Sequence, residues 1–340
     1  MQNRFLGRTG VSVSPLCLGT MMFGPWGNAD ETDSIRIIHR ALDAGINFVD
    51  TADVYSAGES ERIVGKALAG RREDVVLATK FFMPMGDEPN HRGGSRRWIV
   101  RSVEDSLRRL GTDYIDLYQV HRPSQDTDVE ETLGALTDLV RQGKIRYIGS
   151  SSYAASQIVE AQWVARDRRL ERFITEQPPY SMMVRGIEAD VLPTARRHGM
   201  GVLTYSPLGG GWLSGRWRKD SAATPTSAAR PKARFDMTTE ANQRKLEIVE
   251  NLAQLAEEQG MTLIDLAIAF VINHPAVTAA IIGPRTMDQL ESQLTGADVT
   301  LSADVLDRID ELVAPGVTVN PDDNSYGVTE LTPAARRRNP

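Results

Sequence analysis

The feature that most constrains the fold is a repeat of short apolar, β-rich runs, each followed by a stretch with helical spacing. Most consecutive runs begin roughly 30 residues apart, which is the length of one strand plus one helix. Near-continuous apolar strands are typical of parallel sheets covered on both faces. Eight runs occur, at residues 14–18, 46–50, 75–80, 115–121, 145–149, 173–177, 201–206 and 277–283. Eight such units predict a (β/α)₈ TIM barrel.

Three segments interrupt this rhythm. Residues 4–13 alternate around Gly10 and predict a β-hairpin that closes the N-terminal end of the barrel. Residues 216–239 are rich in Ala, Pro, Ser, Lys and Arg, which predicts a long mobile loop on the C-terminal face. Residues 315–340 show little periodicity and predict an irregular tail. We expect one barrel domain over residues 1–340.

Charge and composition favour some classes of protein over others. The net charge of −6 argues against a partner such as nucleic acid or an anionic membrane surface, and no apolar run is long enough to cross a membrane. Cys17 is the single cysteine, and the first residues carry no apolar signal core, so we expect a reducing cytoplasm. The five histidines are scattered without metal-ligand spacing, so we expect no metal site.

Four polar residues at the ends of consecutive strands form a chemically coherent set. Active sites of (β/α)₈ barrels lie at the C-terminal ends of the strands, where Asp50, Lys80 and His121 close three of the runs and Tyr55 follows Asp50. A phenol between an ammonium and an imidazole can donate a proton to a developing alkoxide. We expect Lys80 to lower the pKa of Tyr55 from about 10 toward neutral, and Asp50 to keep Lys80 charged.

Each of these residues, taken alone, also fits a structural role in helix capping, packing or a satisfied buried histidine. Lys80 fits such a role least well, because the chain has six lysines and 33 arginines, and generic positive charge is therefore supplied by arginine. A lysine here indicates a need for a compact or titratable amine.

The order of short motifs along the chain resembles the aldo-keto reductase family, of bacterial type, from residue 6 to about residue 295. The motifs are Leu6-Gly7-Arg8-Thr9-Gly10 with Leu18-Gly19-Thr20-Met21, residues 48–55, Ala78-Thr79-Lys80, His121-Arg122-Pro123, residues 149–152, Glu176-Gln177 with Tyr180, residues 205–209 and residues 282–285. The resemblance implies NADPH-dependent reduction of a small aldehyde or ketone. It implies that Tyr55 is the general acid, that Lys80 and Asp50 tune its pKa, and that His121 orients the carbonyl oxygen.

The resemblance also implies a set of cofactor contacts. Ser151, Ser152 and Gln177 would bind the carboxamide, and Tyr205 would stack on the nicotinamide. The pyrophosphate would be wrapped by Ser206, Pro207, Leu208, Gly209 and Gly211. Arg285 would bind the 2′-phosphate of NADPH, with Gln289 and Gln293 toward the adenine. The remaining expected contacts are Gly19, Thr20, Met21, Asp50 and Gly283.

Two positions depart from the family pattern. Ser152 stands where the family usually has Asn, and Ser292-Gln293 stands where Glu-Asn is common near the adenine. These departures make the preference between NADPH and NADH less secure than the class of cofactor.

We expect the substrate pocket to contain several aromatic residues beside Tyr55 and His121, although the same residues equally fit packing at the barrel rim. They are Trp26, Phe81, Phe82 and Trp98. The loop at residues 216–239 and the tail near Tyr326 are candidate lids over this pocket.

Other classes of protein fit the sequence to different degrees. A short-chain or medium-chain dehydrogenase would need a G-x-G-x-x-G fingerprint or a Tyr-x-x-x-Lys pair, and the sequence has neither. A nicotinamide-binding regulatory subunit stays open, because the sequence is also similar to potassium-channel β-subunits. A sugar-nucleotide keto or enoyl reductase of secondary metabolism stays open too, although His121 favours carbonyl over double-bond reduction. A monomer and a homo-oligomer fit the sequence equally.

Overall fold

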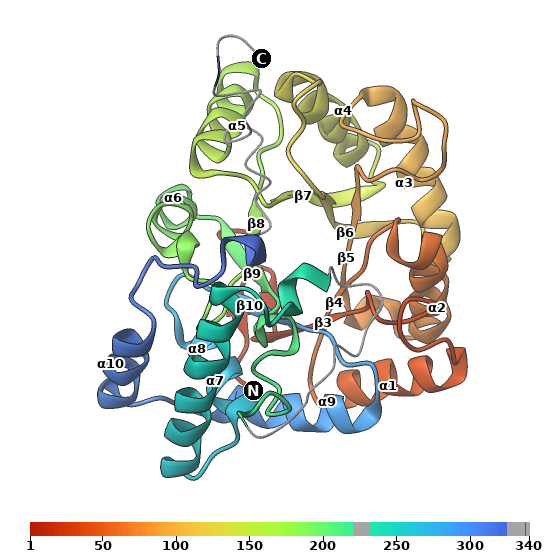
Figure 1. Ribbon diagram of the computed structural model, residues 1–340. Helices are drawn as coiled ribbons and strands as arrows, with labels where there is room; N and C mark the ends of the chain where they lie inside the picture. The colour runs from red at the N-terminus through yellow and green to blue at the C-terminus, as the bar shows by residue number, and fades with distance from the viewer. Residues whose placement is uncertain (220–231, 325–336, 338–340) are drawn as a thin grey trace.

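The predicted TIM barrel is confirmed by a computed structural model, which describes residues 1–219, 232–324 and 337. Eight parallel strands close into a barrel in the order β10-β3-β4-β5-β6-β7-β8-β9, and helices surround them (Figure 1). The strands are β3 (Leu16–Gly19), β4 (Phe48–Asp50), β5 (Val76–Phe81), β6 (Ile115–Val120), β7 (Ile145–Ser151), β8 (Thr175–Gln177), β9 (Gly201–Tyr205) and β10 (Ala279–Ile282). Each lies within one of the predicted runs or extends it by one or two residues.

Capping residues and glycines mark the ends of several helices. The α-helices of the described chain are α1 (Glu31–Asp43), α2 (Glu59–Leu68), α3 (Arg96–Leu110), α4 (Val129–Arg141), α5 (Ala155–Arg168), α6 (Val191–His198), α7 (Glu240–Glu258), α8 (Leu263–Asn273), α9 (Met287–Leu294) and α10 (Ala303–Leu312). Ser95 caps α3 by accepting a hydrogen bond from the amide of Trp98. Gly199 ends α6 in a left-handed conformation that favours glycine.

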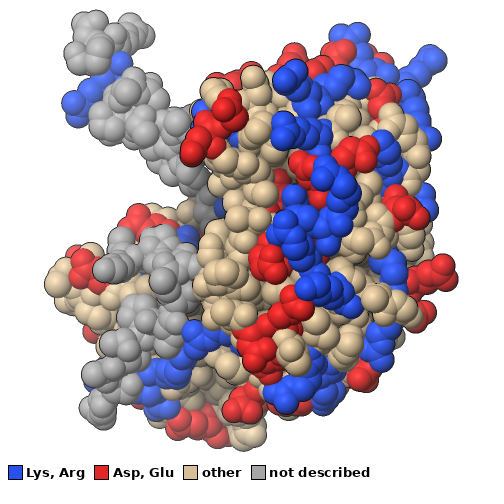
Figure 2. Space-filling model, turned by 90° about the vertical axis from the view of Figure 1, so that its right-hand side faces the viewer, with Lys and Arg blue, Asp and Glu red and all other residues tan. Residues whose placement is uncertain are grey.

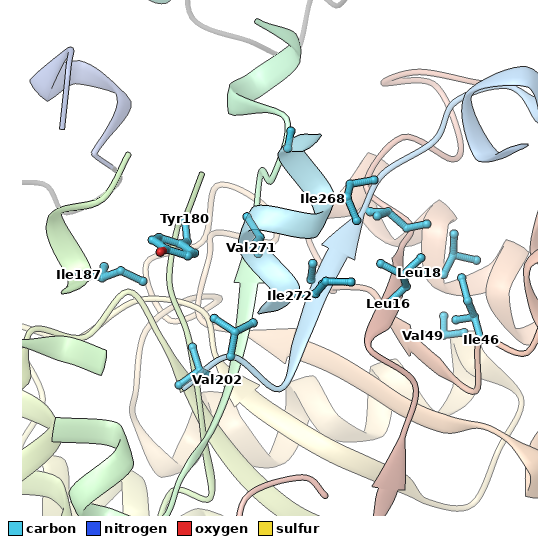
Figure 3. Packing of buried hydrophobic residues seen from close by; sticks show 14 of the residues in the cluster. Leu16, Leu18, Ile46, Val49, Tyr180, Ile187, Val202, Ile268, Val271 and Ile272 are labelled. Atoms are coloured by element: carbon cyan, nitrogen blue, oxygen red, sulfur yellow. The ribbon is translucent and has the colours of Figure 1, made fainter. Parts of the chain in front are cut away.

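Alternation along the strands divides the core into an inner and an outer cluster. Phe48, Ala78 and Leu117 belong to a small buried cluster made mainly by the barrel strands. Their strand neighbours Val49 and Tyr118 belong instead to the large cluster that the strands share with the helices. Figure 3 shows part of this outer cluster, in which Ile268, Val271 and Ile272 of α8 lie with Leu16 and Leu18 of β3. Burial of each such side chain stabilises the fold by about 1.5 to 3 kcal/mol.

The predicted hairpin is present, and it covers the N-terminal end of the barrel. Strands β1 (Arg4–Phe5) and β2 (Ser12–Val13) pair antiparallel. Leu6 and Val13 are fully buried in the inner cluster, so they fill the floor of the barrel. Gly7 has φ +58°, and a Cβ there would lie 2.9 Å from the amide nitrogen of Gly201 at the start of β9. The floor therefore requires glycine where the hairpin approaches the strands.

The segment between β9 and α7 was predicted as a loop at residues 216–239. Its middle, residues 220–231, lies outside the described residues, as does Tyr326 in the tail. The described end forms a turn, η5 (Lys232–Phe235), and Thr239 then caps α7. The fully buried Lys245 donates to the carbonyl oxygen of Arg234 and to Asp323, at 3.1 and 2.7 Å. Within the described ranges, no helix is both long and apolar enough to span a membrane.

Candidate active site

The barrel places Asp50 and Lys80 side by side at the C-terminal end of the strands. Inward-facing positions of β4 and β5 change from apolar to polar at this level, with Phe48 followed by Asp50 and Ala78 followed by Lys80. The ammonium of Lys80 lies 2.5 Å from Oδ1 of Asp50 and donates to the carbonyl oxygen of Thr51 at 2.8 Å. Both side chains are almost completely shielded from solvent.

The other oxygen of Asp50 is held by two buried glutamines. Gln119 on β6 and Gln177 on β8 each donate from Nε2 to Oδ2 of Asp50 at 3.0 Å. Gln177 also donates to Oε1 of Gln119 at 3.1 Å. The sequence did not single out Gln119, because only the closed barrel brings an inward residue of β6 beside Asp50. This network fixes the carboxylate that faces Lys80.

Tyr55 reaches Lys80 from the turn η1 (Tyr55–Gly58) that follows β4. Its hydroxyl oxygen lies 3.3 Å from Nζ of Lys80. After Tyr55 the backbone is left-handed at three consecutive residues, Ser56 (φ 49°), Ala57 (φ 54°) and Gly58 (φ 89°). Such conformations are costly for residues other than glycine and cluster at functional sites. Here they turn the chain back into α2 and leave Tyr55 over the barrel end.

The protonation state of Tyr55 differs from the expectation. Burial raises the pKa of Tyr55 above its ordinary value, and the nearby charge of Lys80 only partly opposes this. The prediction of a pKa lowered toward neutral is therefore wrong for this structure, because desolvation outweighs the ammonium. Burial alone would lower the pKa of Lys80, but Asp50 and Tyr55 together raise it, so Lys80 is charged as expected.

His121 follows β6 and lies against the other side of Tyr55. The two rings meet edge to face, with centroids 5.9 Å apart. Burial, with the charges of Lys80 and Arg122, holds the pKa of His121 well below its ordinary value, so the ring is neutral at pH 7. Its buried Nδ1 has no hydrogen-bond partner in the described part of the chain. A neutral imidazole offers one N–H donor and one acceptor.

A cavity of about 710 Å³ opens over these residues. The expected site residues that line it are Gly19, Thr20, Met21, Asp50, Tyr55, His121, Ser151, Gln177, Tyr205, Ser206, Pro207, Leu208, Gly211, Gly283, Arg285, Gln289 and Gln293. Its volume is in the range of ligand-binding clefts. One continuous cavity thus joins the ends of the strands to the start of α9.

At the catalytic end of the cavity, two serines and a tyrosine are linked. Ser151 donates to the carbonyl oxygen of Gln177 at 2.9 Å. Ser152, in a left-handed conformation with φ 59°, lies 3.3 Å from the hydroxyl of Tyr205 and accepts a hydrogen bond from Arg122 at 2.7 Å. The amide nitrogen of Gln177 donates to Asp50 and Gln119, and Gln177 also lines the cavity.

The other end of the cavity is built at the N-terminus of α9. Thr286 caps this helix, and the side-chain oxygen of Gln289 accepts from the amide of Arg285 at 2.8 Å. Asn28 donates to the carbonyl oxygen of Arg285 at 3.1 Å and so ties the β10–α9 turn to the loop after β3. Helix N-termini and guanidinium groups favour phosphate.

Two of the four aromatic residues predicted for the pocket, Phe81 and Trp98, lie elsewhere. Phe81 is fully buried on the outer side of β5 and stacks on Tyr118, 4.8 Å between centroids, because it alternates with the inward Lys80. Trp98 is buried in the outer cluster and stacks on His91. Phe82 packs against the same cluster. Trp26 is 40% exposed and lies beside Tyr55, with 6.3 Å between the ring centroids.

Several residues were not assigned to the site from the sequence. Those lining the cavity are Met22, Arg122, Ser214, Arg216, Arg234, Ile264, Ile281 and Asp288. Gly210, inside the segment expected at the pyrophosphate, and Ser292, beside Gln293, also line it. Arg122 could have been found from its place next to His121, whereas most of the others come from loops and helix ends that periodicity does not align. Ser152, Gly209 and Lys80 adjoin the cavity without lining it.

The donor set fits a dinucleotide. Three guanidinium groups line the cavity, those of Arg216, Arg234 and Arg285. Asp288 is an acidic residue of the same lining. Gly209, Gly210 and Gly211 all have positive φ and form a tight turn, in which the amides of Gly209 and Gly211 donate to the carbonyl oxygens of Ser206 and Leu208 at 2.9 Å. Gly210 and Gly211 line the cavity, and a glycine-rich turn of this kind lets a phosphate approach the backbone closely.

Comparisons with known proteins agree with this geometry. The family model named aldo/keto reductase family matches residues 15–314. The "Uncharacterized oxidoreductase YrpG" of Bacillus subtilis (strain 168) is 42% identical, over 92% of this chain and 96% of its own. The "Aldo-keto reductase YhdN" of the same organism is 37% identical, over 87% and 89%. A "Probable voltage-gated potassium channel subunit beta" of Arabidopsis thaliana is also 37% identical, over 92% and 97%.

Proposed function

The chain belongs to the aldo/keto reductase family and is an oxidoreductase, and from this premise we propose that it reduces an aldehyde or ketone to the alcohol with NADPH. The observation that carries the proposal is the contact of Tyr55 with Lys80 at 3.3 Å beside a neutral His121. These groups supply a proton donor and a carbonyl-orienting group at one end of the cavity.

Tyr55 is the general acid. Its raised pKa means that the hydroxyl holds its proton at neutral pH, ready to give it to the carbonyl oxygen. As the proton leaves, the ammonium of Lys80 stabilises the phenolate that remains. Asp50, which accepts from Lys80 at 2.5 Å, keeps that ammonium charged and in place. His121 donates a hydrogen bond to the same carbonyl oxygen and fixes its direction toward Tyr55.

Bound NADPH supplies the hydride to the carbonyl carbon. Ser151, Ser152 and Oε1 of Gln177 would hold the carboxamide, and Tyr205 would stack on the ring and select one face. The segment from Ser206 to Gly211 would bind the pyrophosphate. Gly19, Thr20 and Met21 would form the opposite wall.

Arg285 would bind the 2′-phosphate together with the N-terminus of α9, which is why we propose NADPH rather than NADH. Gln289 and Gln293 lie on α9 beyond it and would face the adenine.

The test is a fluorescence titration with NADPH and NADH, followed by turnover of 4-nitrobenzaldehyde and a panel of ketones and sugar aldehydes. We expect tight NADPH binding and aldehyde turnover. Absence of NADPH binding would overturn the cofactor assignment, and binding without turnover of any carbonyl would overturn the reductase assignment.

The similarity to a protein named as a potassium-channel β-subunit favours a second candidate, a nicotinamide-binding regulatory subunit. The two candidates differ in turnover: a regulatory subunit binds NADPH but gives no steady oxidation of it with carbonyl compounds.

A further inference from the structure

Arg122 brings a fixed positive charge to the catalytic end of the cavity. It follows His121 directly, and it lines the cavity that also contains Tyr55. Its NH1 nitrogen donates to the carbonyl oxygen of His121 at 3.0 Å and to the hydroxyl of Ser152 at 2.7 Å. Two neutral acceptors thus hold one edge of the guanidinium against the wall.

The rest of the guanidinium is uncommitted. An arginine side chain has five N–H donors, and the two bonds of NH1 account for two of them. Nε and NH2 form no hydrogen bond to any residue in the described ranges. Nitrogens on two adjacent corners of a planar group match the two oxygens of a carboxylate.

Arg122 also lacks the acid partner that many surface arginines have in the described part of the chain. On the helical face in Figure 2, Lys and Arg side chains lie beside Asp and Glu. Arg36 pairs with Asp33 at 2.6 Å, and Arg40 with Glu291 at 2.7 Å. Within the described ranges, Arg122 forms no ion pair.

The titratable groups near Arg122 do not replace such a partner. Tyr55 is protonated and His121 is neutral. Glu176 on β8 is buried, and its carboxyl is engaged by the hydroxyl of Ser150 at 2.5 Å and the amide of Tyr153 at 3.0 Å. Burial raises the pKa of Glu176 to about 7, so it carries only part of a negative charge at neutral pH.

We propose that Arg122 binds a carboxylate on the carbonyl substrate, so that the preferred substrates are aldehydes or ketones that also carry a carboxylate. This inference rests on the proposed function and names the substrate class for the same site. The guanidinium, held at one edge by Ser152 and the backbone of His121, presents its other edge to the substrate.

The experiment compares two substrates of nearly equal shape, 4-carboxybenzaldehyde and the uncharged 4-nitrobenzaldehyde, with their 3-substituted isomers. The variants are R122Q and R122K, and R36Q is the matched surface control. We expect R122Q to lower kcat/KM for the carboxylate substrate about 10- to 150-fold more than for the nitro substrate, the range for a hydrogen bond to a charged group. R122K should keep part of the preference, because it retains the charge and loses the fork. R36Q should change neither value.

Equal losses with both substrates, together with weaker NADPH binding, would show that Arg122 serves the cofactor and would overturn the proposal. No loss with either substrate would also overturn it. If the wild-type protein turns over no carbonyl compound, the proposed function fails separately. The binding of benzoate and of nitrobenzene to the NADPH-loaded protein then decides, because a carboxylate site binds benzoate more tightly in the wild type and loses that preference in R122Q.

Discussion

The ammonium of Lys80 lies 2.5 Å from the carboxylate of Asp50, and neither side chain meets solvent. A buried ion pair of this kind adds little stability over an apolar pair, but loss of one partner leaves an uncompensated charge in the interior. The same contact holds the group that faces Tyr55, so stability and chemistry depend on it together.

Replacement of Asp50 by Asn should therefore lower the free energy of unfolding by about 3 to 5 kcal/mol. Urea unfolding of the ligand-free protein measures this. The control is D43N, which breaks the surface pair with Arg71 and should change stability by less than about 1 kcal/mol. Similar losses in the two variants would contradict the prediction.

Replacement of Tyr55 by Phe removes the proposed proton donor and little else. We expect turnover to fall on the order of 10²-fold or more, the scale of general acid catalysis, while the NADPH dissociation constant stays nearly unchanged. Steady-state kinetics and fluorescence titration measure the two effects. Unchanged turnover would show that another group donates the proton.

Replacement of Arg285 by Ala should weaken NADPH binding by about 1 to 3 kcal/mol and leave NADH binding almost unaffected, because only NADPH carries the 2′-phosphate. Calorimetric titration with both cofactors gives the difference. R308A, on the exposed helix α10, is the control and should change neither affinity. Equal losses for the two cofactors in R285A would place the phosphate elsewhere.

Replacement of Glu176 by Gln tests the buried acid behind the nicotinamide end. The folded-state pKa of Glu176 is about 7, above the ordinary 4.5, so the folded protein holds this proton more tightly than the unfolded chain does. Stability contributed by the bound proton is present below about pH 4.5 and is lost as the pH rises through about 7.

E176Q has no titrating group here and does not lose this stability. The unfolding free energy of E176Q minus that of the wild type should therefore rise by up to about 3 kcal/mol between about pH 5 and 8. Urea unfolding at both values measures the gain. The exposed E160Q on α5 should show no such gain, and a parallel pH dependence in the wild type and E176Q would refute the assignment.

The barrel could be predicted because its strands are buried on both faces and read as apolar runs. The grouping of Asp50, Lys80 and His121 could be predicted because each closes one of these runs, and the geometry of the fold brings strand ends together. Strand β5 shows that a run alone does not tell to which side each side chain points. Lys80 and Phe81 are neighbours in sequence, but alternation puts one at the site and the other in the outer core.

The partners of the polar groups behind the site could not be found from the sequence. Gln119 occurs in a strand that reads as ordinary core, and Glu176 belongs to a recognised motif, but the groups that each contacts come from other strands. The prediction for the pKa of Tyr55 was wrong for a related reason. This pKa depends on how completely the surrounding residues exclude water, which the spacing of charges along the chain does not report.

The hairpin of β1 and β2 closes the N-terminal end of the barrel. Leu6 and Val13 fill this end, and in the part of the chain that the structure describes the cavity over Asp50 and Tyr55 lies at the opposite end. We therefore expect reactant and product to use the same opening, beside the 40% exposed Trp26. A substitution at this opening therefore changes the rates of substrate binding and of product release together. It can change the turnover rate without any change to the groups that perform the chemistry.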